Sequence, residues 1–355
     1  MESKSFYING IGLVSPQQTF DEHYFLEDVV DYQHTVLSCI TPDFKKFINP
    51  IQLRRLSRIQ RIGLTAAAIA VKGTQPDLML GVVTATGEGS SAGKGAFISE
   101  VLLQEEKQIT PTGFVQSSYN NLAGLVAMTY QMMGYNNNFV SGGVAFETAL
   151  QDAMLQLIGS PSQEILVGSY DESHLPHLEL DNRTGHYKRE ERSSLMLFSR
   201  LTSGTLWGEG ACFFRLSMQA TETTWCSLGE PLVVYRPETL DIVDELNSFL
   251  GDNETDISSI DVLVSGASGD ANADKQILQI EHALASVTLC RFKHLCGEYF
   301  TSTSFAVWLA ASLLKRNKVP ASTCFNSVRP AHPIKKVLVA NHYRGRSVTF
   351  ILLKI

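Results

Sequence analysis

The stretch that most constrains the fold spans residues 139–157, which read as a short strand, a Gly-Gly turn and a helix. Apolar residues recur along this helix in two rows, so we expect the helix to be buried. The first turn of a helix carries unpaired N–H groups and the positive end of the helix dipole. A buried helix start after a tight turn therefore suits an anion or an acyl oxyanion, and enzymes often place a nucleophile there. Here the turn, residues 141–144, contains no cysteine.

Composition and charge exclude several classes of protein. With 355 residues, 44% of them hydrophobic, the chain is long enough to bury a large core. No run approaches the ~18 apolar residues of a membrane span. A net charge of −7 with dispersed basic residues argues against a nucleic-acid partner. The six cysteines lack metal-ligand spacing, so we expect free thiols, no metal and no disulfide framework.

The N-terminus and the glycine-rich segment carry no targeting or cofactor motif. Residues 1–6 lack the charged start and apolar core of a signal peptide, so we expect a cytoplasmic protein. The glycines of residues 85–95 fit neither a phosphate-binding loop nor a dinucleotide fingerprint. We therefore interpret this segment as a flexible connection and expect no cofactor.

Strand and helix patterns alternate along both halves of the chain. The first half has a helix pattern at residues 54–71 and strand patterns at 78–84 and 164–172. The second half has helix patterns at 241–250 and 304–314, a strand at 261–266, and a closing hairpin at 337–353. Residues 188–192 read as a solvated mixed-charge face. Alternation of this kind predicts an α/β protein built from two similar halves.

Several motifs occur in the order in which the β-ketoacyl synthases carry them, and the chain resembles that family over nearly its whole length. The motifs are residues 8–16, 54–58, 120–124, the strand-turn-helix at Val140, Gly208-Glu209-Gly210-Ala211, and Lys293 followed by Gly297. The resemblance implies the thiolase-like fold, in which two similar βαβαβ-rich halves form a five-layered αβαβα sandwich. We assign residues 1–220 to the N-terminal half and 221–355 to the C-terminal half.

The residues that carry the family's chemistry are replaced in this sequence. The resemblance implies a cysteine nucleophile at the central turn and two histidines that stabilise the oxyanion and enolate. Val144 stands at the cysteine position, Ala267 at the first histidine, and Glu298 at the second, where Lys293 is retained. An ionised Glu cannot donate a hydrogen bond to a developing oxyanion. We call Val144, Ala267, Lys293 and Glu298 the remnant site.

Lys293 and Glu298 are expected to lie within hydrogen-bond reach near the start of the central helix. Two interpretations stay open for this pair. It either holds the loop as a structural ion pair or takes part in some residual chemistry.

Two hypotheses of function follow, and they leave enzyme activity open. In the first, the chain is a non-catalytic subunit of the chain-length-factor type, pairing with an active synthase in fatty-acid-like, polyketide or aryl-polyene biosynthesis. In the second, it is a rewired acyltransferase or condensing enzyme that uses Cys296, Lys293 and Glu298.

The resemblance also implies partners. We expect a homodimer, or a heterodimer with an active ketoacyl synthase, joined through the strands that follow the central helix. Acyl carrier protein is a further candidate partner. The basic helix start is either a docking face for that acidic protein or a solvated helix end. Its residues are Arg54, Arg55, Arg58 and Arg61.

Overall fold

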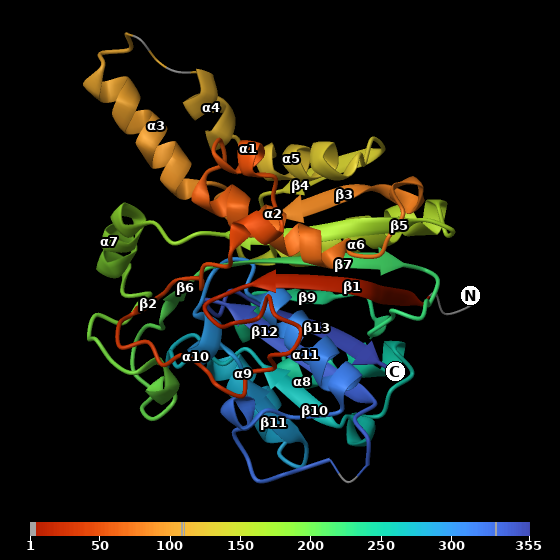
Figure 1. Cartoon of the computed structure of the whole chain (residues 1–355). Helices are drawn as coiled ribbons and strands as arrows, with labels where there is room; N and C mark the ends of the chain where they lie inside the picture. The colour runs from red at the N-terminus through yellow and green to blue at the C-terminus, as the bar shows by residue number, and fades with distance from the viewer. Residues whose placement is uncertain (1–4, 108, 110, 331) are drawn as a thin grey trace.

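The framework of the chain consists of two groups of strands with the same internal pattern (Figure 1). The computed structural model describes residues 5–107, 109, 111–330 and 332–355. Residues 1–4, on which the expectation about targeting partly rests, lie outside this part. The first group contains β1 (Phe6–Val14), β3 (Met79–Ala85), β4 (Tyr135–Phe139), β5 (Glu164–Asp171) and β7 (Gly210–Ser217). The second contains β8 (Cys226–Leu228), β9 (Leu232–Tyr235), β10 (Val262–Ser265), β11 (Thr288–Arg291), β12 (Lys336–Tyr343) and β13 (Ser347–Lys354).

Both groups combine three parallel strands with antiparallel neighbours. In the first group β4, β3 and β5 are parallel, and β7 is antiparallel to β5 and β1. In the second β11, β10 and β12 are parallel, and β13 is antiparallel to β12, β8 and β9. Strand β8 also pairs with β1, which links the groups into one 11-stranded sheet. Two short strands, β2 (Val36–Leu37) and β6 (Trp207–Gly208), pair separately.

Helices cover both groups of strands and also fill the space between them. Helices α6 (Ala145–Gly159) and α11 (Thr303–Arg316) lie in the central core, α2 (Arg58–Ala70) and α5 (Asn121–Tyr130) cover the first group, and α8 (Ile242–Asp252) and α9 (Lys275–Ala283) cover the second. The remaining helices are α1 (Pro50–Leu53), α3 (Ser91–Leu103), α4 (Pro111–Ser117), α7 (Leu175–Thr184) and α10 (Lys293–Cys296).

Alternate residues of single strands face different cores, as the pleat of a strand requires. In β5, Ile165 and Val167 join the central core while Leu166 packs under α2 and α5. In β12, Val339 faces the central core and Leu338 packs under α8 and α9. The order of layers is therefore helix, sheet, helix, sheet, helix. The predicted αβαβα arrangement of two similar halves is confirmed.

The strand-turn-helix of residues 139–157 is present as predicted. Strand β4 ends at Phe139, a short turn of 3-10 helix spans Gly142–Val144, and α6 follows. The boundary predicted at residues 220 and 221 falls between β7 and β8 and stays a prediction.

Three local interpretations were wrong. Residues 85–95 are not only a flexible connection, because residues 91–95 form the start of α3 and the Ser90 side chain caps that helix by accepting from the Gly93 N–H. The helix expected from residue 54 begins at Arg58, after a capping box of Ser57 and Gln60. Within the face expected at residues 188–192, residues 189–191 are exposed as predicted, but Lys188 is buried, and its Nζ donates hydrogen bonds to Thr202 Oγ1 (2.8 Å) and the Gly269 carbonyl (3.1 Å).

The expected dimer edge was also wrong. The strand that follows the central helix is β5, which lies between β3 and β7 and has no free edge. Strand β4, which precedes that helix, is the last strand at one end of the large sheet and pairs on one side only. Its sequence, Tyr-Asn-Asn-Asn-Phe, makes this edge polar in the middle rather than apolar. Within the described residues, no helix is both long and apolar enough to cross a membrane.

The close contact between β1 and α2 gives a test of the fold. A Cβ atom on Gly12 would lie 2.0 Å from the Ala66 carbonyl oxygen. We expect Gly12→Ala to lower the free energy of unfolding by about 1–3 kcal/mol, because overpacking forces backbone to move. The matched control is Gly124→Ala in α5, where nothing lies within 4 Å and the change should stabilise the helix by up to about 1 kcal/mol. Urea unfolding curves measure both, and equal stability of the two variants would contradict this packing.

Candidate functional site

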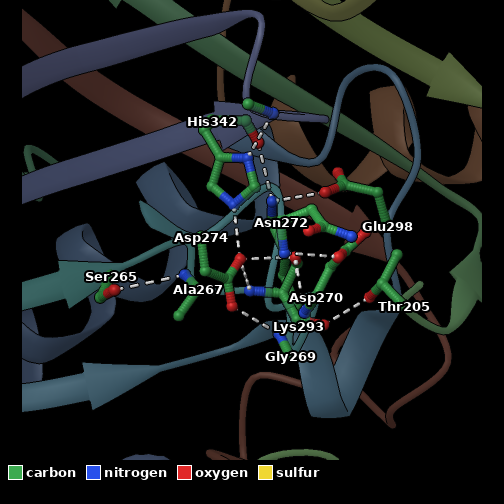
Figure 2. Close-up of polar contacts among 12 residues, drawn as sticks. Thr205, Ser265, Ala267, Gly269, Asp270, Asn272, Asp274, Lys293, Glu298 and His342 are labelled. Carbon is green, nitrogen blue, oxygen red and sulfur yellow. Dashed lines mark hydrogen bonds and ion pairs between the residues drawn. The ribbon is translucent and has the colours of Figure 1, made fainter. Parts of the chain in front are cut away.

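Lys293 and Glu298 form a buried ion pair at the centre of the remnant site (Figure 2). Lys293 Nζ lies 2.6 Å from Glu298 Oε2 and donates a second bond of 2.8 Å to the His342 carbonyl. Ser302 Oγ donates to the other Glu298 oxygen at 3.1 Å. Lys293 starts α10, and Gly297 (φ +73°) ends it, so the chain turns back and both side chains enter the same space. The predicted contact is confirmed.

The end of β12 contacts the segments that carry the other remnant-site residues. A Cβ atom on the glycine before Val144 would lie 2.2 Å from the Tyr343 ring. One on the glycine before Ala267 would lie 2.0 Å from Asn341 Oδ1. Lys293 bonds to the carbonyl of His342, which lies between these two residues of β12. The segments that carry Val144, Ala267 and Lys293 therefore all meet at the end of β12.

Aromatic rings cover the central turn. The Tyr343 ring packs against Gly143, and Phe300 stacks on Tyr343 with 4.9 Å between ring centroids. Val144 itself is buried. The turn therefore combines a buried aliphatic side chain, Val144, with a glycine covered by an aromatic ring.

Glu147, in the first turn of α6, is a buried carboxyl group that the sequence analysis missed. Its Oε1 accepts hydrogen bonds from Thr303 (2.6 Å) and Thr349 (3.1 Å), whereas Oε2 has no hydrogen-bond partner among the described residues. Burial raises the pKa of Glu147, and the two hydroxyl donors offset only part of that effect. The available signal was one acidic residue in an otherwise apolar helix start.

His342 is the second residue that sequence reasoning missed. Its Nε2 lies 2.9 Å from Asp274 Oδ1, and its Nδ1 is 3.0 Å from the backbone nitrogen of Gly345 (Figure 2). Because that backbone N–H must donate, Nδ1 accepts and Nε2 carries the proton in a neutral ring. Burial by itself raises the pKa of Asp274, but hydrogen bonds from His342 and Ser268 outweigh it and lower the pKa. Both ring nitrogens are occupied, so His342 has none to offer a substrate. No motif surrounds it in the sequence.

Cys296 does not have the properties of a nucleophile. It is fully buried, and burial raises the pKa of its thiol well above the usual value. Its Sγ lies 3.3 Å from the Gly297 carbonyl oxygen, while Lys293 is already bonded to Glu298 and His342. Among the described residues, no group of three or more His, Cys, Asp or Glu side chains is placed to hold a metal ion.

The basic helix start is largely taken up by structural contacts. Arg58 makes a two-pronged ion pair with buried Glu209, with 2.8 Å between Nη1 and Oε2. Arg61 Nε donates to the Leu56 carbonyl. Arg54 and Arg55 are exposed and precede α2.

Removing one member of the central ion pair should destabilise the protein strongly. Lys293→Met leaves Glu298 as an uncompensated buried charge, which costs about 3–5 kcal/mol in comparable cases. We expect the double variant Lys293→Met/Glu298→Leu to recover most of that loss, since no charge remains to be buried. Chemical denaturation of the three proteins measures the difference. A Lys293→Met protein as stable as the wild type would contradict the pairing.

The buried Glu147 predicts a pH-dependent stability difference. Its pKa is raised in the folded state, so folding favours the protonated form, and the penalty for ionisation grows as pH rises above the ordinary value of 4.5. Glu147→Gln avoids this penalty. We therefore expect the variant to gain thermal stability relative to the wild type at pH 8, and to gain less at pH 4. Paired melting curves at both pH values measure this, and a pH-independent difference would contradict it.

Comparisons with known proteins agree with this architecture. Residues 37–181 match the family described as "Beta-ketoacyl synthase, N-terminal domain". No curated protein sequence matches the chain.

Similar solved structures include three ketosynthase structures, each aligned over 99% of this chain and 99% of its own. One is AntDE:AntF, a type II PKS acyl-carrier protein in complex with its ketosynthase bound to the hexaketide (15% identity, TM-score 0.73). Another is a β-ketoacyl synthase from Burkholderia phymatum STM815 (15%, 0.78), and a third is the ishigamide ketosynthase/chain length factor (14%, 0.79). Residues 37–181 are therefore similar to the N-terminal domain of the β-ketoacyl synthases, and the chain as a whole has the fold of the solved ketosynthase structures.

Proposed function

We propose that this chain is a non-catalytic, β-ketoacyl-synthase-like subunit that works in the cytoplasm beside an active synthase, in the manner of a chain-length factor. The observation that carries the proposal is that Lys293 and Glu298, the charged side chains of the remnant site, are hydrogen-bonded within the protein. Val144 is buried at the central turn beside Gly143, on which the Tyr343 ring packs, and Lys293 is bonded to Glu298 and a carbonyl. Condensation needs a thiolate to carry the acyl chain and free donors to stabilise the oxyanion. Val144 supplies no thiolate, and the Lys293 ammonium is already bonded to Glu298 and to a backbone carbonyl.

The alternative of a rewired acyltransferase receives no support from the geometry. It requires Cys296 as a thiolate, with Lys293 free to activate it. The thiol is buried with a raised pKa, and Lys293 has two partners. Glu298, the third member of that set, accepts from Lys293 and Ser302 on its two oxygens.

A partner subunit is supported by the surface around the free edge of the sheet. Strand β4 is unpaired on one side, and α5 packs on β4. Large apolar side chains are exposed at the end of α5 and on α3, which projects from the body next to α4 (Figure 1). They include Met128 and Met133, and Leu102 and Leu103, all more than 70% exposed. Such a combination of unpaired strand and apolar surface is typical of a protein–protein interface. The proposed interface joins this chain to an active synthase in the cell, or to a second copy when it is expressed alone.

Acyl carrier protein is the second proposed partner. A cavity of 690 Å³ lies beside Glu298 and has four basic side chains in its lining, Arg236, Lys275, Arg344 and Arg346. Guanidinium groups suit the phosphate that links a carrier protein to its prosthetic arm. The proposed pathways are fatty-acid-like, polyketide or aryl-polyene biosynthesis.

Co-expression tests the proposal. We expect the chain alone to give no condensation of acyl- and malonyl-carrier protein, and Val144→Cys to stay inactive because both histidine donors are still missing. Expressed with an active ketoacyl synthase from the same genome, the chain should co-purify in a one-to-one ratio and change the length of the product. Product analysis by mass spectrometry measures this. The proposal would be contradicted if the chain alone catalysed condensation. It would also be contradicted if the synthase neither bound the chain nor changed its products when the chain was present.

A further inference from the structure

Cys290 and Cys324 face each other at the β11 end of the sheet, where a later segment of the chain lies against the last strand. Strand β11 is the last strand at that end, and an antiparallel bridge joins its Cys290 to Cys324, which lies beyond α11. Both cysteines are free thiols. No part of the remnant site or of the proposed interface uses them.

The backbone holds this pair in the arrangement that suits a cross-strand disulfide. The Phe325 N–H donates to the Leu289 carbonyl at 2.9 Å, and these residues are the chain neighbours of Cys324 and Cys290. The bond of the ladder therefore joins the neighbours of the two cysteines, and Cys290 and Cys324 themselves form a non-hydrogen-bonded pair. Such pairs have Cα atoms about 4.5 Å apart, with side chains on the same face and close together. Disulfides need Cα separations of about 4.4–6.8 Å. A bond between the sulfurs therefore asks for little backbone movement.

The two thiols differ in accessibility and in their neighbours. Cys324 is partly exposed, whereas the other five cysteines are buried. Arg329 Nη1 lies 3.0 Å from Cys324 Sγ, so a positively charged guanidinium stands beside the sulfur that an oxidant can reach. Cys290 is fully buried, and Thr323 Oγ1 donates to its sulfur at 3.7 Å. These surroundings make Cys324 the thiol that an oxidant meets first and Cys290 the thiol that is protected.

We propose that Cys324 and Cys290 form a reversible redox pair that responds to hydroperoxides. The Cys324 thiolate attacks the peroxide, the O–O bond breaks, and sulfenic acid and an alkoxide or hydroxide form. The Cys290 thiol then attacks the Cys324 sulfur, the S–S bond forms as the S–O bond breaks, and the hydroxyl leaves as water with the thiol proton. The two thiols together lose two electrons and two protons, and the peroxide is reduced to water and an alcohol or a second water. A small dithiol reverses the reaction.

The disulfide would fasten the segment after α11 to the edge of the sheet. The disulfide would make a covalent loop of residues 290–324, at a point where a β-bridge already joins the two segments. Strand β11, which carries Cys290, leads directly into α10, which begins at Lys293. The bond therefore covalently fixes the strand that supports the remnant site. This inference does not depend on the proposed function, because it concerns thiols outside the remnant site and the proposed interface.

Treatment of the full-length chain with hydrogen peroxide tests the pair. The thiol count in denaturant should fall from six to four, since two of the six thiols join, and dithiothreitol should restore it. Trypsin should release residues 276–291 linked to residues 319–335, because cleavage does not occur between Arg329 and Pro330. Each of these peptides contains one cysteine, so their linkage identifies the bond by mass spectrometry.

Variants separate this chemistry from general oxidation. Cys324→Ser should keep its five thiols under the same treatment, and Arg329→Gln should slow the loss of thiols several-fold. Cys226→Ser, which removes a buried cysteine elsewhere, should form the link at the rate of the wild type. An unchanged count of six thiols, a Cys324 oxidised to sulfinic acid with Cys290 free, or a Cys324 link between two chains would each overturn the proposal.

Discussion

The enclosure of α6 and α11 between two sheets is the constraint on which the rest of the structure depends. Both helices are apolar around most of their circumference, and strands cover them from two sides. The start of α6 therefore lies inside the protein, at the end of β12. Every charged group brought there loses water, and each needs a partner or a proton to compensate.

The polar groups around that helix start meet this requirement by bonding to one another. Lys293 is held by Glu298 and a backbone carbonyl, and His342 by Asp274 and a backbone N–H. Glu147 meets the same requirement through two hydroxyl donors and a raised pKa. Lys293, Glu298, His342 and Asp274 thus use their donors and acceptors on one another and on the backbone, whereas Glu147 Oε2, Asn341 Oδ1 and Tyr343 Oη have no hydrogen-bond partner among the described residues.

The two ends of the sheet are treated differently, and the difference matters for assembly. At the β11 end, the bridge between Cys290 and Cys324 covers the last strand with a segment of the same chain. At the β4 end, the outer side of the strand is unpaired among the described residues, and the neighbouring helices expose large apolar side chains. An unpaired edge is a liability for an isolated chain. The β11 edge is therefore covered by a segment of the same chain, whereas the β4 edge is open to pairing with a strand of another chain.

The sequence by itself determined the order of strands and helices, the buried central helix, the absence of a cysteine from the central turn and the Lys293–Glu298 contact. These follow from local periodicity and from two residues separated by one short turn. Only the tertiary structure decided which strand has a free edge, that Lys188 is buried, and that Glu147, His342 and Asp274 surround the remnant site. Each of those facts depends on contacts between residues far apart in the chain. A residue pattern specifies which face of an element is apolar, but the sheet order and the packing of layers decide what that face meets.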